Sequence, residues 1–187
     1  MTISGYTGFS LLAVLVLLST SPGRAETAKK HVTPKHPIAT AQRIGGAGAW
    51  SAYLYNGKSG PVCYLAGAPQ KSEPARFKRK PPSATVTHRP QENVFNVVNF
   101  YEGYPLTPGS DASLDIGGTK FDLFTKGDGA WSRTAETDKA IVEAMVKGRT
   151  AVITGTAAKG PTTTDTYSLA GFTHTMALID KACGVKG

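Results

Sequence analysis

Residues 49–69 read AWSAYLYNGKSGPVCYLAGAP, and their pattern predicts a β-hairpin. From residue 50 to residue 55 apolar and more polar side chains alternate with a period of two, as in a half-buried strand. Asn56 and Gly57 form a strong turn dipeptide, and the short apolar run at residues 62–66 supplies the returning strand. Residues 49–69 are therefore expected to form the first hairpin of a β domain.

The segments beyond this hairpin predict more short strands, separated by glycine and proline. SATVTHRP, residues 83–90, is rich in β-branched residues and ends at Pro90. Residues 112–131 have the pattern of a second hairpin, with Gly117 and Gly118 at its turn. Strand-like segments also occupy residues 93–104, 150–158 and 164–171.

Two segments change to a helical period. Apolar side chains recur at i, i+3, i+4 and i+7 from Ile141 onward, and Thr134 or Thr137 can cap the start of this helix. In the last segment they recur at intervals of four, three and four residues from Phe172 to Cys183, so Cys183 faces the core. There is no alternating βαβ pattern. We therefore expect a mainly β domain, an antiparallel β-sandwich with two short α-helices.

The first 25 residues have the pattern of a secretory signal peptide. An apolar run at residues 8–20 is too short to span a membrane, and small residues precede a cleavage site between Ala25 and Glu26. An uncleaved anchor is the alternative, because no Lys or Arg precedes the run. No later stretch is long and apolar enough for a transmembrane segment. We expect a periplasmic location, with outer-membrane association or secretion as variants.

The chain after the cleavage site divides into an arm and one domain. Residues 26–46 contain few large apolar residues and predict a flexible arm, and residues 47–187 form the domain. His31 and His36 lie in the arm, where a plain linker is favoured over a weak metal site. The glycine-rich residues 45–48 are interpreted as a flexible joint.

Positive charge is concentrated in two places, the arm and a basic loop at residues 70–82. Without Arg24 the chain has 20 basic and 13 acidic residues, a formal charge of +7. Such a charge favours an anionic partner, although a plain solvated loop is the commoner role of a charge run. The cations are not interleaved with aromatic residues as in single-strand binders, so we expect no nucleic-acid partner. The candidate anion-binding residues are Lys71, Arg76, Lys78, Arg79 and Lys80.

Cys63 and Cys183 are the two cysteines of the chain. An even number in an exported protein favours a disulfide. The alternative is a thiol-dependent enzyme or redox protein using Cys63, with His88 or His174 as base and Asn99 or Asp165 to orient it. His88 and His174 are both expected at the surface, whereas Trp50 and Trp131 are expected in the core. No spacing predicts a catalytic site, a metal site or a cofactor.

Four ordered segments carry a resemblance to a known family: VTHRPQENV (86–94), GYPLTPGSDASLDIGGTKFDLFTKGDGAW (103–131), TDKAIVEAMVKG (137–148) and DTYSLAGFTHTMALIDKACG (165–184). Together they resemble the invasion-associated locus B family of Gram-negative bacteria. The resemblance implies a periplasmic or exported protein with an immunoglobulin-like β-sandwich core and a Cys63–Cys183 bridge. It supplies no catalytic residues.

These observations lead to one preferred hypothesis and two alternatives. The preferred function is that of an exported, non-enzymatic envelope protein that binds an unidentified protein or anionic component. The thiol-dependent enzyme is one alternative. A secreted, host-facing virulence factor is the other, since the family name implies a role in host-cell invasion.

Overall fold

The computed structural model describes residues 40–185, which contain eleven strands and two α-helices. The strands of the first half are β1 (Gln42–Ala47), β2 (Trp50–Gly57), β3 (Gly60–Gly67), β4 (Lys71–Glu73), β5 (Ser83–Arg89) and β6 (Val94–Tyr101). The later strands are β7 (Asp111–Ile116), β8 (Thr119–Lys126), β9 (Gly129–Trp131), β10 (Thr150–Thr156) and β11 (Thr162–Ser168). The helices are α1 (Ala135–Lys147) and α2 (Phe172–Cys183), and a 3₁₀ turn, Pro90–Glu92, joins β5 to β6.

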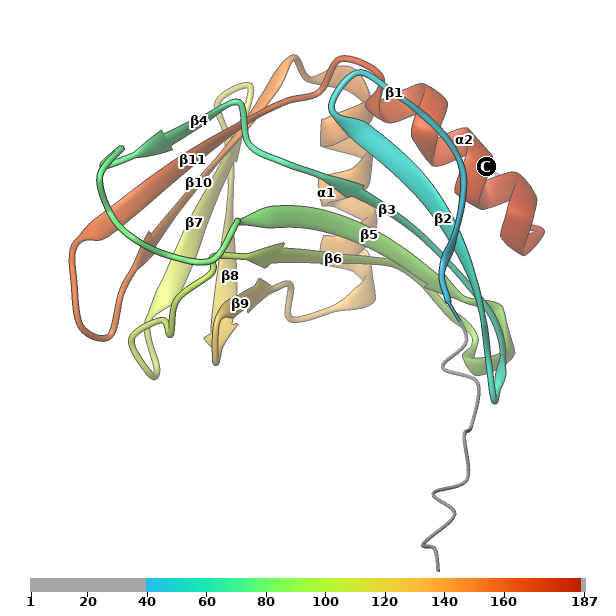
Figure 1. The fold of residues 1–187 in the computed structure, drawn as a ribbon, viewed down its shortest axis with the longest axis horizontal. Coiled ribbons are helices and arrows are strands. Elements are labelled where there is room, and N and C mark those ends of the chain that lie inside the picture. Colours follow the sequence, from blue (N-terminus) through green and yellow to red (C-terminus); the bar gives the residue numbers. More distant parts are fainter. Residues whose placement is uncertain (1–39, 186–187) are drawn as a thin grey trace, which may run out of the picture. The chain divides into compact units, whose positions relative to one another are not determined.

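All strand pairs are antiparallel, and together they form one hydrogen-bonded sheet in the order β1-β2-β3-β5-β6-β9-β8-β7-β10-β11-β4. The three-residue strand β9 links β6 to β8, and the strand direction changes there, so the sheet has two differently oriented halves (Figure 1). The predicted class, mainly antiparallel β with two short helices, is confirmed. The two layers are halves of one open sheet rather than separate sheets.

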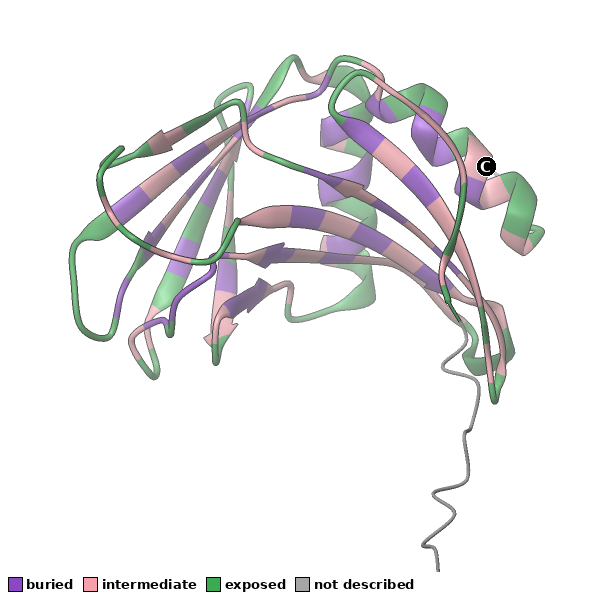
Figure 2. Cartoon of the chain, viewed as in Figure 1, coloured by how far each residue is buried: buried purple, intermediate pink, exposed green. Residues whose placement is uncertain are grey.

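The core lies where the two halves and α2 meet. Buried and half-buried residues alternate along the strands, as Figure 2 shows. The ring of Phe100 on β6 packs edge-on against Tyr167 on β11, with centroids 5.5 Å apart. Trp50 on β2 packs edge-on against Phe172 of α2 at 5.1 Å. Burial of such large rings contributes about 2–3 kcal/mol each.

Both predicted helices are confirmed, together with their caps. The side chain of Thr134 accepts a hydrogen bond from the backbone N–H of Thr137 at 3.1 Å and so caps the start of α1. Gly184 adopts a left-handed conformation (φ 65°) that ends α2. α1 packs against β6, and α2 packs on β1, β2 and β3.

The predicted arm is too long at its carboxyl end. Residues 42–46 belong to β1, which pairs with β2, so these residues are part of the sheet. Gly46 is required there by close approach, because a Cβ atom at this position would lie 2.3 Å from the carbonyl oxygen of Trp50. The glycine-rich stretch therefore fits a strand rather than a flexible joint. The rest of the arm, the predicted signal peptide and the site at Ala25 and Glu26 lie outside the described residues.

Candidate functional site

The basic loop alternates between residues that point inward and residues that face solvent. Phe77 packs edge-on against the ring of Tyr104, with centroids 5.3 Å apart, and Arg79 is also turned inward. The alternate residues, Arg76, Lys78 and Lys80, are exposed. We call these three the cationic ridge. The loop is thus an extended segment with two internal anchors and three external cations.

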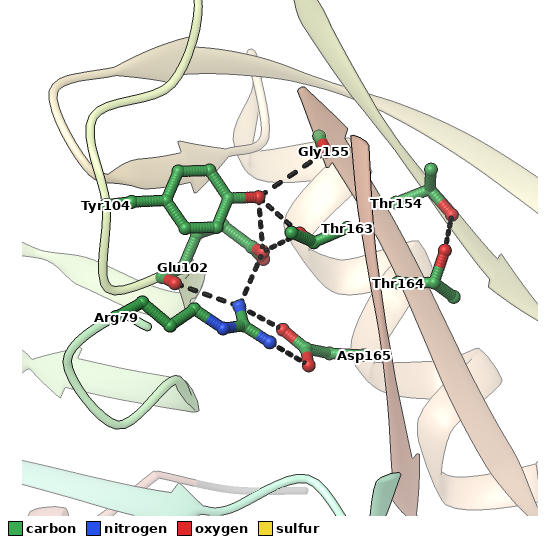
Figure 3. Close-up of polar contacts among 8 residues, drawn as sticks. All are labelled: Arg79, Glu102, Tyr104, Thr154, Gly155, Thr163, Thr164 and Asp165. Carbon is green, nitrogen blue, oxygen red and sulfur yellow. Dashed lines mark hydrogen bonds and ion pairs between the residues drawn. The ribbon is translucent and has the colours of Figure 1, made fainter. Parts of the chain in front are cut away.

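Arg79 is held by carboxylates inside the protein (Figure 3). Its Nη1 donates to Asp165 Oδ2 at 2.7 Å, and its Nη2 donates to Asp165 Oδ1 at 2.5 Å. Nη1 also donates to the backbone carbonyl of Glu102 at 2.9 Å. Only 7% of the Arg79 side chain is exposed. Arg79 must therefore be removed from the predicted anion-binding set, because both of its terminal nitrogens already donate to internal acceptors.

Glu102 completes a buried ionic cluster with Arg79 and Asp165. Its Oε2 lies 3.5 Å from Arg79 Nη1 and accepts from the hydroxyls of Tyr104 at 3.3 Å and Thr163 at 3.4 Å. These two hydroxyls also contact each other. Glu102 is fully buried, and its Oε1 has no hydrogen-bond partner in the described part of the chain.

The charges of the buried ionic cluster do not balance when both carboxylates are ionised. One guanidinium then faces two carboxylates, and the cluster carries a net negative charge. Burial, and then repulsion from Asp165, raise the pKa of Glu102 to about 7, although Arg79 and the two hydroxyls act in the opposite direction. The cluster can therefore take up and release a proton near neutral pH.

The other candidate loop residues differ in what they contact. Lys71 forms an ion pair with Glu73 at 2.9 Å, so its charge is largely matched. The cationic ridge has no ion pair within residues 40–185. Lys159 is a further exposed cation. Its neighbour Gly160 lies beside the ring of Phe77.

The predicted disulfide is confirmed. Cys63 on β3 and Cys183 at the end of α2 are bonded, with Cα atoms 5.9 Å apart and 120 residues between them in sequence. Cys63 is fully buried. The bridge therefore fastens the last helix to the first hairpin, and neither sulfur is a free thiol in this structure.

His88 is buried, so its predicted surface position is wrong. It lies opposite Cys63 in the sheet, its Nε2 is 2.9 Å from Asp180 Oδ1, and its Nδ1 accepts from the N–H of Asn96 at 3.1 Å. Nε2 therefore links β5 to α2, and Nδ1 links β5 to β6. His174 is exposed, as expected.

The other groups considered for a thiol site are not assembled around Cys63. Asp165 binds Arg79, and the amide of Asn99 donates to the Ala130 carbonyl at 3.1 Å. Trp131, expected in the core, is only half-buried. It is the neighbour of Asn99 across the pairing of β6 with β9.

The described residues also line surface grooves away from the loop. One of about 590 Å³ lies between α1 and α2 and includes Val142, Val146 and Met176. No group of three or more potential ligands among residues 40–185 is arranged to hold a metal ion. Within the same residues, no helix is long and apolar enough to cross a membrane.

Sequence reasoning missed the role of Glu102, Tyr104 and Thr163, and the pairing of Arg79 with Asp165. A signal was present in the strand period. Asp165 shares its strand face with Tyr167, and Glu102 continues the inward row of Phe100. Charged residues on inward rows require a buried partner, and the basic loop offered one.

Comparison with known proteins places this fold in a family. A family model described as invasion associated locus B (IalB) protein matches residues 56–180. Comparison with curated proteins and with solved structures gives no match. The matched region includes both internal anchors, the buried ionic cluster and most of α2, and it covers more than half of the chain. The chain belongs to the invasion associated locus B family.

Proposed function

We propose that this protein is exported to the periplasm and acts there, without catalysis of its own, by binding an anionic surface through the cationic ridge. Two features support export: the signal-peptide pattern of residues 1–25, and the Cys63–Cys183 bridge, which suits an oxidising compartment.

The observation that carries the binding proposal is the ordered presentation of the cationic ridge. An exposed charge run is usually flexible, and fixing it on a partner costs conformational entropy. Here Phe77 and Arg79 hold the alternate positions inside the protein, and Lys80 N–H donates to the Gly103 carbonyl at 3.1 Å. Part of the entropic cost is therefore met on folding, and the three cations remain free for an external partner.

The partner that fits best is a membrane surface carrying phosphate head groups. The three ridge residues are exposed, and they do not line the groove between α1 and α2, so a broad anionic surface fits better than a small ligand. Each Lys or Arg near an anionic membrane contributes about 1 kcal/mol, so the ridge supplies about 3 kcal/mol at low salt. This attraction decreases as salt screens it.

The test is sedimentation with vesicles of phosphatidylcholine, with and without phosphatidylglycerol. The variant carrying Arg76→Gln, Lys78→Gln and Lys80→Gln should lose most of the salt-sensitive binding to the anionic vesicles. A control carrying Lys120→Gln, Lys126→Gln and Lys147→Gln changes the net charge equally at other exposed positions. It should bind like the parent.

Three results would contradict the proposal. Equal losses of vesicle binding in the ridge variant and the control would show an effect of net charge alone. Unchanged binding in the ridge variant would exclude the ridge as the binding site. Binding to a soluble sulfated polysaccharide but not to vesicles would replace the membrane with a glycan. Export is tested separately by releasing the periplasm by osmotic shock, and recovery of the full-length chain in the cytoplasm would exclude it.

A further inference from the structure

The loop that carries the cationic ridge is fastened by a group that titrates near neutral pH. The ridge itself contains only arginine and lysine, residue types that do not ordinarily change charge near neutral pH. A change of the ridge near neutral pH is therefore expected to come from its support. That support is the buried ionic cluster, in which Glu102 lies directly against Arg79.

We propose that the buried ionic cluster is a proton-dependent fastening, which holds the basic loop closed when Glu102 is neutral and favours an opened loop when Glu102 is ionised. This inference rests on the proposed function for its biological use, since the loop presents the ridge. Its physical basis is independent of any partner.

The groups around Glu102 come from four parts of the fold. The basic loop supplies Arg79, β11 supplies Asp165 and Thr163, and the segment after β6 supplies Tyr104. The hydroxyl of Tyr104 also faces the carbonyl of Gly155 on β10, at 3.4 Å. Arg79 is the one cation among these contacting groups of residues 40–185, and Asp165 already binds it with both oxygens.

The buried hydroxyl of Tyr167 also lies in this region and, within the described chain, has no hydrogen-bond partner. Burial raises the pKa of this hydroxyl, the charges of Glu102 and Asp165 raise it further, and Arg79 acts in the opposite direction. Among residues 40–185, the groups that face Glu102 supply no positive charge beyond Arg79 to offset a second carboxylate. They suit a neutral carboxyl group better than an ionised one.

Opening of the loop would relieve this imbalance. In the closed state the pKa of Glu102 is raised to about 7, whereas a hydrated glutamate titrates near its ordinary value. A group that binds its proton more tightly in the closed state favours the opened state as pH rises. If opening fully hydrates Glu102, the equilibrium constant for loop opening increases roughly thirtyfold between pH 5.5 and pH 8.

Hydrogen exchange of the full chain measures this opening directly. The amide of Lys80 is a suitable probe because its hydrogen bond to Gly103 exists only with the loop closed. After correction for the pH dependence of intrinsic exchange, its protection should fall by up to roughly thirtyfold from pH 5.5 to pH 8. In Glu102→Gln the protection should be similar at both values. Glu143→Gln, which changes an exposed glutamate on α1, should behave like the parent.

Two outcomes would overturn the inference. One is that the protection of the loop in the parent does not change with pH. The other is that Glu102→Gln loses as much protection between pH 5.5 and pH 8 as the parent does. If Glu102→Gln does not fold, a carbon-13 NMR titration of the parent decides the matter. A Glu102 carboxyl with a midpoint near its ordinary value would exclude the proton-dependent fastening, and a midpoint near 7 would support it.

Vesicle binding at the two pH values separates this inference from the proposed function. The parent should bind anionic vesicles more weakly at pH 8 than at pH 5.5, and Glu102→Gln should bind equally at both. No binding at either pH would reject the membrane partner, while the exchange experiment still decides the fastening. Equal binding by the parent at both values would reject control of the ridge by Glu102.

Discussion

Removal of the Cys63–Cys183 bridge should strongly destabilise the protein. The variant is Cys63→Ala with Cys183→Ala, and the bridge closes a loop of 120 residues. In the chain-entropy treatment, a loop of this length restricts the unfolded chain by about 5 kcal/mol at 25 °C. A single domain is commonly stable by about 5–15 kcal/mol, so the variant should lose a large share of its stability.

The effect should be global rather than confined to α2. Phe172 and Ile179 of α2 are buried and Asp180 contacts His88, and none of these contacts involves a cysteine sulfur. They should keep the helix docked in the folded state when the bridge is removed. The bridge therefore acts mainly by limiting the unfolded ensemble.

Urea unfolding and hydrogen exchange test both parts of this reasoning. The free energy of unfolding should fall by about 4–5 kcal/mol in the double variant, and reduction of the parent should give a similar loss. The slowest amides of α2 should still exchange together with those of the sheet. A loss below about 1 kcal/mol would refute the loop-closure estimate. Exchange of α2 alone, ahead of the sheet, would refute the view that packing keeps it docked.

Three further predictions concern charge and capping. Asp165→Asn removes the bidentate carboxylate partner of the buried Arg79 and leaves it only Glu102, at 3.5 Å, so it should cost up to about 3–5 kcal/mol in urea unfolding. Asp111→Asn, in an exposed ion pair, should cost less than about 1 kcal/mol. The pKa of Glu102 is about 7 in the folded protein and 4.5 in the unfolded chain. Its contribution to the free energy of unfolding is therefore complete below pH 4.5 and is lost as pH rises through 7. The parent should thus lose about 3 kcal/mol across this window relative to Glu102→Gln, as measured by unfolding at several pH values. Thr134→Ala removes the cap of α1 and should lower the thermal midpoint through a loss of about 1 kcal/mol.

Local patterns predicted those parts of the fold whose contacts are local. The helical period and the caps placed α1 and α2. The turn of the first hairpin was predicted two residues too early: Asn56 and Gly57 pair within the sheet as the end of β2, and the turn residues are Lys58 and Ser59. The strand β4 was missed because it has three residues and pairs with β11, about ninety positions away in the chain. Pairing at such separation leaves no periodic signal in a short segment.

Side-chain rows predicted more about the site than the motifs did. Ala84 and Val86 face the core, so the two-residue period also places His88 inside. Its neighbours Arg89 and Pro90 suggested a surface position, and the period was the better guide. The same reasoning applies to Asp165, next to Tyr167 on the inward row. What the sequence could not supply is the partner of each buried charge, because a loop residue such as Arg79 has no period of its own.

The buried ionic cluster is better explained by positioning than by stability. A buried ion pair gains little over apolar residues of similar size, because desolvation of both charges offsets their attraction. An apolar side chain at residue 79 would hold the loop by packing alone and would not fix the orientation of the backbone there. The guanidinium instead meets both oxygens of Asp165 and the Glu102 carbonyl, which fixes the orientation of its backbone and hence of Lys78 and Lys80 on either side. Because the same arrangement brings Glu102 to a pKa of about 7, the geometry that orients the cationic ridge also makes its support sensitive to protons.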